Sequence, residues 1–156
     1  MGLIEREIAP ANERYAAGFD KGALPMPPGR KFAVVTCMDA RLDPAKFLGL
    51  EEGDAHVIRN AGGIVSDDAF RSLVISRHLL GTDEVLVIGH TDCGMLTFRD
   101  EEVQERIGTD IPFHSFPDVA ARVAESVRRV KDSPLLTDAV RGFIYDVTTG
   151  RIIEVA

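Results

Sequence analysis

The chain has 156 residues, of which 45% are hydrophobic and 28% are charged, and its formal net charge at pH 7 is -7. This length corresponds to one domain that can bury a core without disulfide bonds. The negative charge argues against nucleic acid and anionic membrane surfaces as partners, because both would repel the chain. We find neither a signal-peptide-like apolar region at the start nor an apolar run near the length of a membrane span, which indicates a cytoplasmic protein.

The beginning of the chain predicts a helical arm. Residues 3 to 19 have a helical pattern that can break at Pro10, with Tyr15 and Phe19 on one face. The proline-rich residues 24 to 29 cannot be helical and should run extended. Such a helix packs either on a second subunit or back on its own sheet, and the residues alone favour neither. We expect a single domain, residues 1–156, in which residues 1–30 form the arm and its linker.

The rest of the chain alternates between strand and helix patterns. Strands are expected at residues 31–37, 55–58, 84–88, 141–147 and 151–155. Helices are expected from Asp43-Pro44, over residues 66–80, once or twice within residues 95–108, and from residue 117 onward. This alternation predicts an α/β fold with a mainly parallel sheet flanked by helices. Right-handed crossovers favour the order 2-1-3-4, with an antiparallel fifth strand at the edge.

Two thiols and one imidazole occur where predicted strands end. Cys37 ends the first strand, and His90 and Cys93 follow the third. In the order 2-1-3-4 these two strand ends are neighbours at the switch point of the sheet, where ligand sites are built. A Cys2His set suits Zn²⁺ and leaves the fourth tetrahedral position for water or substrate, as in catalytic zinc sites. A disulfide is the alternative, which a reducing cytosol disfavours.

A carboxylate and a guanidinium follow the first thiol at alternate positions. Asp39 lies two residues after Cys37 and can occupy the fourth position of the metal. Arg41 can instead hold that carboxylate by a bidentate, charge-assisted pair. The site is therefore either open, with Asp39 orienting a zinc-bound hydroxide, or closed by Asp39. Asp92 is more typical of a turn than of a ligand.

A glycine pair and nearby apolar residues are candidates for the substrate pocket. Gly62 and Gly63 permit positive φ and close backbone approach, so their loop either lines the site or is an ordinary tight turn. The apolar side chains that we expect to bind a gas-like substrate are Val65, Phe70 and Leu96.

These residues resemble the β-class carbonic anhydrases. The family motifs Cys-x-Asp-x-Arg and His-x-x-Cys match Cys37, Asp39, Arg41, His90 and Cys93 one by one. The resemblance continues through residues 57–62, 89–95 and 142–146, so it covers nearly all of the chain from about residue 30 onward. The compact length is similar to that of the short, archaeal-like branch of the family.

The resemblance implies an enzyme, a zinc lyase that reversibly hydrates CO2 to bicarbonate and a proton by attack of zinc-bound hydroxide. It implies zinc held by Cys37, His90 and Cys93, with Asp39 either paired with Arg41 or, in a closed form, bound to the metal. It also implies homodimers or higher oligomers built from dimers, in which the N-terminal helix embraces the neighbour. The alternatives are a CS2 or COS hydrolase on the same zinc site and a non-catalytic zinc protein with a closed site.

The sequence departs from the family pattern at two places. Plant-type members carry a substrate-orienting glutamine shortly before the first strand, where this chain has Pro28-Gly29. Members inhibited by bicarbonate use a tryptophan, an arginine and a tyrosine. Arg59 matches the arginine, but the chain contains no tryptophan, so we expect that inhibition to be absent or altered.

Overall fold

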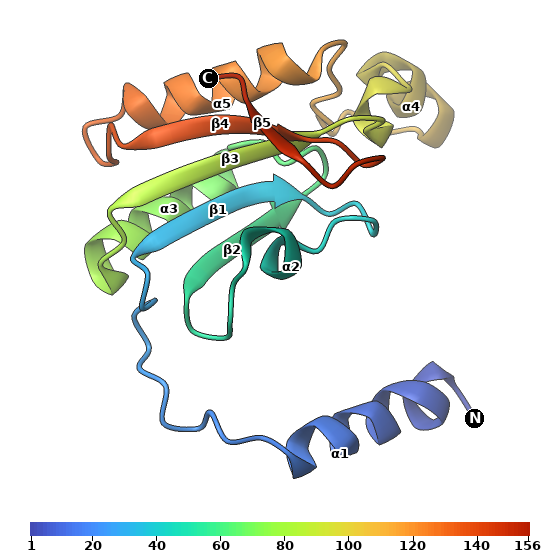
Figure 1. Cartoon of the computed structure of the whole chain (residues 1–156). Helices are drawn as coiled ribbons and strands as arrows, with labels where there is room; N and C mark the ends of the chain where they lie inside the picture. The colour runs from blue at the N-terminus through green and yellow to red at the C-terminus, as the bar shows by residue number, and fades with distance from the viewer.

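A five-stranded sheet in the order β2-β1-β3-β4-β5 forms the centre of the computed structural model, which describes residues 1–156 (Figure 1). The strands are β1 (Phe32–Cys37), β2 (Ala55–Asn60), β3 (Glu84–His90), β4 (Val140–Tyr145) and β5 (Ile152–Glu154). The first four are parallel, and β5 pairs antiparallel with β4. The predicted fold class and strand order are therefore confirmed.

The central strand β1 is buried on both faces, as its continuous apolar run predicts. Ala33, Val34, Val35 and Thr36 have no exposed surface. Branched side chains of this kind suit a strand between two packed layers. The one polar side chain among them is satisfied, because the Thr36 hydroxyl donates a hydrogen bond of 2.9 Å to the carbonyl of Ile88.

The helices are η1 (Ile4–Ile8), α1 (Ala9–Ala17), α2 (Pro44–Leu48), α3 (Asp67–Leu80), η2 (Gly94–Leu96), α4 (Asp100–Ile107) and α5 (Val119–Lys131). Three of the helices, α2, α3 and α5, begin at side chains that cap them. The Ser66 hydroxyl accepts a hydrogen bond from the Ala69 amide at the start of α3, and Gly81 ends that helix with a φ of 74°. Side chains from α3 and α5 share one core cluster with the sheet, so both helices are fixed relative to the strands.

Two strands extend further than their apolar runs suggest. Pairing of β1 with β3 ends at Thr36 and Ile88, whereas pairing of β3 with β4 continues to His90 and Tyr145. β2 likewise continues to Asn60, opposite Cys37. His90 is thus the last residue of a strand and not part of the loop that follows it. Backbone pairing with the neighbouring strand, β4 for β3 and β1 for β2, explains the difference, since pairing does not depend on apolar side chains.

The N-terminal arm lies apart from the sheet, to which an extended segment joins it (Figure 1). No residue of η1 or α1 is buried. Five large apolar side chains of the arm are between 50% and 59% exposed: Leu3, Ile4, Ile8, Tyr15 and Phe19. The arm therefore does not fold back on its own sheet, which was one of the two arrangements that the sequence allowed.

The hydrogen bonds and ion pairs between the arm and the rest of the chain involve the loop before β2. The Tyr15 hydroxyl donates a hydrogen bond of 3.1 Å to Glu52, and Lys21 forms ion pairs with Glu51 and Glu52. These contacts are exposed to solvent, which screens them, so they hold the arm only weakly. Among all the helices, none combines the length and the apolar character that crossing a bilayer requires.

Close packing of α5 on the sheet yields a test of the fold. A Cβ atom on Gly142 would lie 2.6 Å from the Val123 side chain and 2.9 Å from the Val127 side chain. We therefore expect Gly142→Ala to lower the free energy of unfolding by about 1 to 3 kcal/mol, measured by denaturant titration. Gly18→Ala is the control, because no heavy atom lies within 4 Å of its added Cβ. Equal stability of the two variants would contradict this packing.

Candidate metal centre

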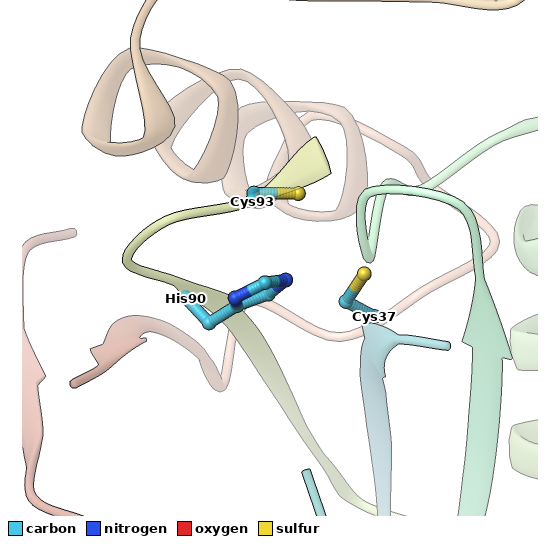
Figure 2. Close-up of side chains that lie close together, drawn as sticks. All are labelled: Cys37, His90 and Cys93. Atoms are coloured by element: carbon cyan, nitrogen blue, oxygen red, sulfur yellow. The ribbon is translucent and has the colours of Figure 1, made fainter. Parts of the chain in front are cut away.

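Three potential metal ligands converge at the carboxyl ends of β1 and β3. Cys37 is the last residue of β1, His90 is the last of β3, and Cys93 lies in the following turn (Figure 2). Their ligand atoms all lie within 4.8 Å of one another, and all three residues are buried. The sequence-based expectation that these side chains are neighbours agrees with this geometry.

A glycine lets the loop after β2 pack directly on the end of β1. Gly63 has a φ of 61°, and a Cβ atom there would lie 2.7 Å from the backbone nitrogen of Cys37. No other residue fits this contact without moving β1, because the neighbouring atoms are backbone. Gly63 thus allows the loop after β2 to pack against the backbone of Cys37.

The orientation of His90 indicates a missing partner. Its Nδ1 lies 2.7 Å from the carbonyl oxygen of Thr91. A carbonyl only accepts, so Nδ1 carries the hydrogen and Nε2 has a free lone pair. Nε2 is buried and has no hydrogen-bond partner. Buried polar atoms are rarely left alone, and a metal ion held with the two thiols would satisfy this one.

The two neighbouring thiols shift each other's pKa in opposite directions. The Cys93 thiol, the His90 ring and the backbone amides of Asp39 and Gly62 hold the pKa of the Cys37 thiol below its usual value, although burial opposes them. The Cys37 sulfur and burial raise the pKa of the Cys93 thiol. For His90, burial by itself lowers the pKa, but the nearby Cys37 sulfur, the Thr91 carbonyl and the Asp39 carboxylate outweigh burial and raise it. A thiolate beside an imidazole is a donor set that binds metal.

Asp39 lies beside these ligands and is held by Arg41. Its Oδ1 accepts hydrogen bonds from the backbone nitrogen of Arg41 at 2.9 Å and from Nε at 3.0 Å, and its Oδ2 accepts one from Nη2 at 2.8 Å. These hydrogen bonds hold the pKa of the Asp39 carboxyl far below its usual value, so it remains ionised. Oδ2 also lies 3.8 Å from His90 Nε2. The carboxylate is therefore next to the metal site while its charge is paired.

Two further residues hold this constellation, and sequence patterns did not assign them such contacts. Arg59 donates to the carbonyl oxygens of Cys37 at 2.9 Å and Asp39 at 2.8 Å. Its guanidinium therefore holds the backbone at the end of β1. By sequence, Arg59 matched only an arginine of the family members that bicarbonate inhibits. Asp92, expected to be a turn residue, has a φ of 53° typical of a turn and also contacts Arg41. A positive φ at a non-glycine residue points to a structural or functional role, but it can be seen only once the backbone conformation is known.

A cavity of about 350 Å³ opens beside the ligands. Its lining consists of Cys37, Met38, Asp39, Ala61, Gly62, Cys93, Gly94, Met95, Thr97 and Phe98. Gly62 lines it as expected, but Gly63, Val65, Phe70 and Leu96 do not. Val65, just before α3, is buried in the core cluster, and Phe70 on the first turn of α3 packs against that cluster. Neither side chain lines the cavity beside the ligands.

The comparisons with known proteins agree with this geometry. The family model for carbonic anhydrase matches residues 32–112. Beta-carbonic anhydrase 1 of Mycobacterium tuberculosis is 49% identical over 152 residues, which cover 92% of this chain and 93% of that protein. Carbon disulfide hydrolase of an Acidianus species is 35% identical over 174 residues, with 90% and 83% covered. The solved structure of carbonic anhydrase from Glaciozyma antarctica has a TM-score of 0.93 and 46% identity, with 100% of both chains covered. With these relatives and this site, the chain belongs to the β-carbonic anhydrase family.

Proposed function

We propose that this enzyme catalyses the reversible hydration of CO2 to bicarbonate and a proton. One observation carries the proposal: His90 Nε2 is buried without a partner between two thiols and beside the Arg41-held carboxylate of Asp39. The same four kinds of side chain recur at the family's motif positions. The relatives named carbonic anhydrase support the substrate.

We assign Zn²⁺ to Cys37, His90 and Cys93. A set of three protein ligands leaves one tetrahedral position free, which is the arrangement of catalytic zinc. When bound, zinc lowers the pKa of water towards ~7 and so supplies a nucleophile near neutral pH. We place the protein in the cytoplasm, where both thiols, which are free in this chain, stay reduced.

Asp39 and Arg41 control what the reacting water can do. The Asp39 carboxylate stays ionised beside Arg41, so its Oδ2 can accept the hydrogen of that water and aim the lone pair at carbon. The same oxygen lies 3.8 Å from His90 Nε2, close enough to compete for the metal if Arg41 released it. Arg41 thus keeps the fourth position available.

The cavity walls suit an uncharged, linear substrate. Met38, Ala61, Met95 and Phe98 provide an apolar lining next to Asp39. Such walls offer CO2 little hydrogen bonding and attract it through apolar contact. CS2 has the same shape and is still less polar, and a carbon disulfide hydrolase is among the relatives at 35% identity. CS2 or COS hydrolysis is therefore the second candidate.

The test of the function is stopped-flow CO2 hydration on protein of known zinc content, at neutral and at alkaline pH. CS2 and COS turnover are assayed on the same preparation. We expect CO2 hydration that rises with pH, because two thiolates neutralise the charge of zinc and damp its acidifying effect. Absence of CO2 hydration in zinc-loaded protein, with CS2 or COS turned over, would replace the first candidate by the second.

Removal of the Arg41 side chain tests the role of the Asp39–Arg41 pair. We expect Arg41→Ala to keep its metal, because no ligand is changed, and to lose activity about 10- to 100-fold as Asp39 moves onto the metal. Metal analysis and CO2 hydration rates measure the two effects. Arg71→Ala is the matched control, since Arg71 pairs with the exposed Asp68 on α3, outside the site. A fully active Arg41 variant would refute this role.

We further propose that the arm packs on a second copy of the chain, forming a homodimer. Ile4, Ile8, Tyr15 and Phe19 recur at the spacing of one helical face and are exposed. Other apolar side chains are exposed on β2 and α3, which offer a surface for such a helix: Val57, Ile75 and Leu79. Apolar faces on both elements favour burial between copies.

Light scattering during size-exclusion chromatography tests the arm. We expect the double variant Ile8→Ser/Phe19→Ser to shift the protein from dimer to monomer at micromolar concentration, because it removes apolar area from the exposed face. Glu13→Ser, on the same helix, should leave the dimer intact. A dimer of unchanged strength in the double variant would show that another surface joins the copies.

A further inference from the structure

The guanidinium of Arg41 contacts a second carboxylate besides Asp39. Arg41 Nη1 donates to Asp92 Oδ2 at 2.8 Å, and Nη2 donates to the Asp92 carbonyl oxygen at 2.9 Å. We propose that Asp92 is a positioning residue that fixes Arg41 in the orientation in which it holds Asp39 off the metal. The inference deepens the proposed function, because it concerns control of the same site.

The two carboxylates use different parts of the guanidinium. Asp39 accepts from Nε and Nη2, and Asp92 accepts from Nη1 and, through its carbonyl, from Nη2. Each nitrogen of the Nη pair carries two N–H groups, so the contacts do not compete for a donor. Because the guanidinium is planar and rigid, fixing one edge fixes the direction of the other. Asp92 therefore supports the pair of Arg41 with Asp39.

Exposure explains why Arg41 needs this support. The Arg41 side chain is 47% exposed, whereas that of Asp39 is only 17% exposed. A long, half-exposed arginine loses rotamer freedom when it pairs, which weakens an unsupported ion pair. The link to Asp92 also joins two segments 51 residues apart, the loop after β1 and the turn after β3. Arg41 is thus tied to the turn between His90 and Cys93.

The backbone of Asp92 presents both acceptors at once. Its φ of 53° lies in the left-handed region, which aspartate, asparagine and glycine occupy more readily than other residues. In this conformation the carboxylate and the carbonyl oxygen both meet Arg41. Asp92→Gly and Asp92→Asn are therefore suitable variants, whereas alanine would add backbone strain.

The test uses cobalt-substituted protein, whose visible spectrum reports the fourth ligand without any turnover. At one fixed pH, each protein is titrated with imidazole, a probe whose neutral form competes for that position. We expect Asp92→Gly to weaken imidazole binding about two- to fivefold, because a loosened Arg41 lets Asp39 occupy the metal more often. Asp92→Asn keeps an uncharged acceptor and should lie between Asp92→Gly and the wild type. Asp68→Asn, an exposed carboxylate paired on α3, should leave the affinity unchanged.

The same titration in the Asp39→Ala background shows whether Asp92→Gly changes imidazole affinity through Asp39 or by disturbing the site in another way. With no carboxylate at position 39, Asp92→Gly should leave imidazole affinity unchanged, since nothing remains for Arg41 to hold. An equal loss in both backgrounds, or unchanged or tighter binding in the wild-type background, would overturn the role of Asp92. If the affinities follow expectation but CO2 is not hydrated, the proposed function fails and this inference stands. Failure of cobalt to bind would overturn both.

Discussion

The parallel pairing of β1 with β3 is the constraint on which the site depends. It places Cys37 at the end of β1 and His90 at the end of the neighbouring β3, although they are 53 positions apart in the sequence. β3 extends beyond its pairing with β1 because it continues to pair with β4 as far as His90 and Tyr145. The turn after His90 then brings Cys93 back over the same edge. Sheet register thus positions two of the three candidate ligands, and the turn after β3 supplies the third.

Charge at the site is arranged so that each negative group has a specific partner. The thiols and the imidazole would share a metal ion, and the Asp39 carboxylate, which stands closest to them, is paired with Arg41. Arg59 holds the two carbonyls that flank this segment, so the backbone around Asp39 is fixed as well. A carboxylate that is ionised and near the metal can orient water or displace it. In the proposed mechanism, the contacts of Arg41 with Asp39 favour the first of these two roles.

Sequence patterns predicted the strand order, the convergence of the three candidate ligands and the Asp39–Arg41 pair, because strand ends and short motifs are local features. They missed the contacts of Asp92 and Arg59, which join residues 51 and 22 positions apart. Val65 and Phe70 were expected near the site from their apolar character, yet Val65 before α3 and Phe70 on its first turn pack in the core. Direction of a side chain depends on helix phase, which apolar composition does not specify.

The most direct measurement of the central claim is zinc-edge X-ray absorption of the zinc-loaded wild-type protein. Cys37, His90 and Cys93 predict a first shell of two sulfur atoms, one imidazole nitrogen and one light atom in a tetrahedral arrangement. The Asp39→Ala variant should keep the same two sulfur atoms and the imidazole. A shell with no sulfur, or with one sulfur atom, would contradict the assignment of both thiols to the metal.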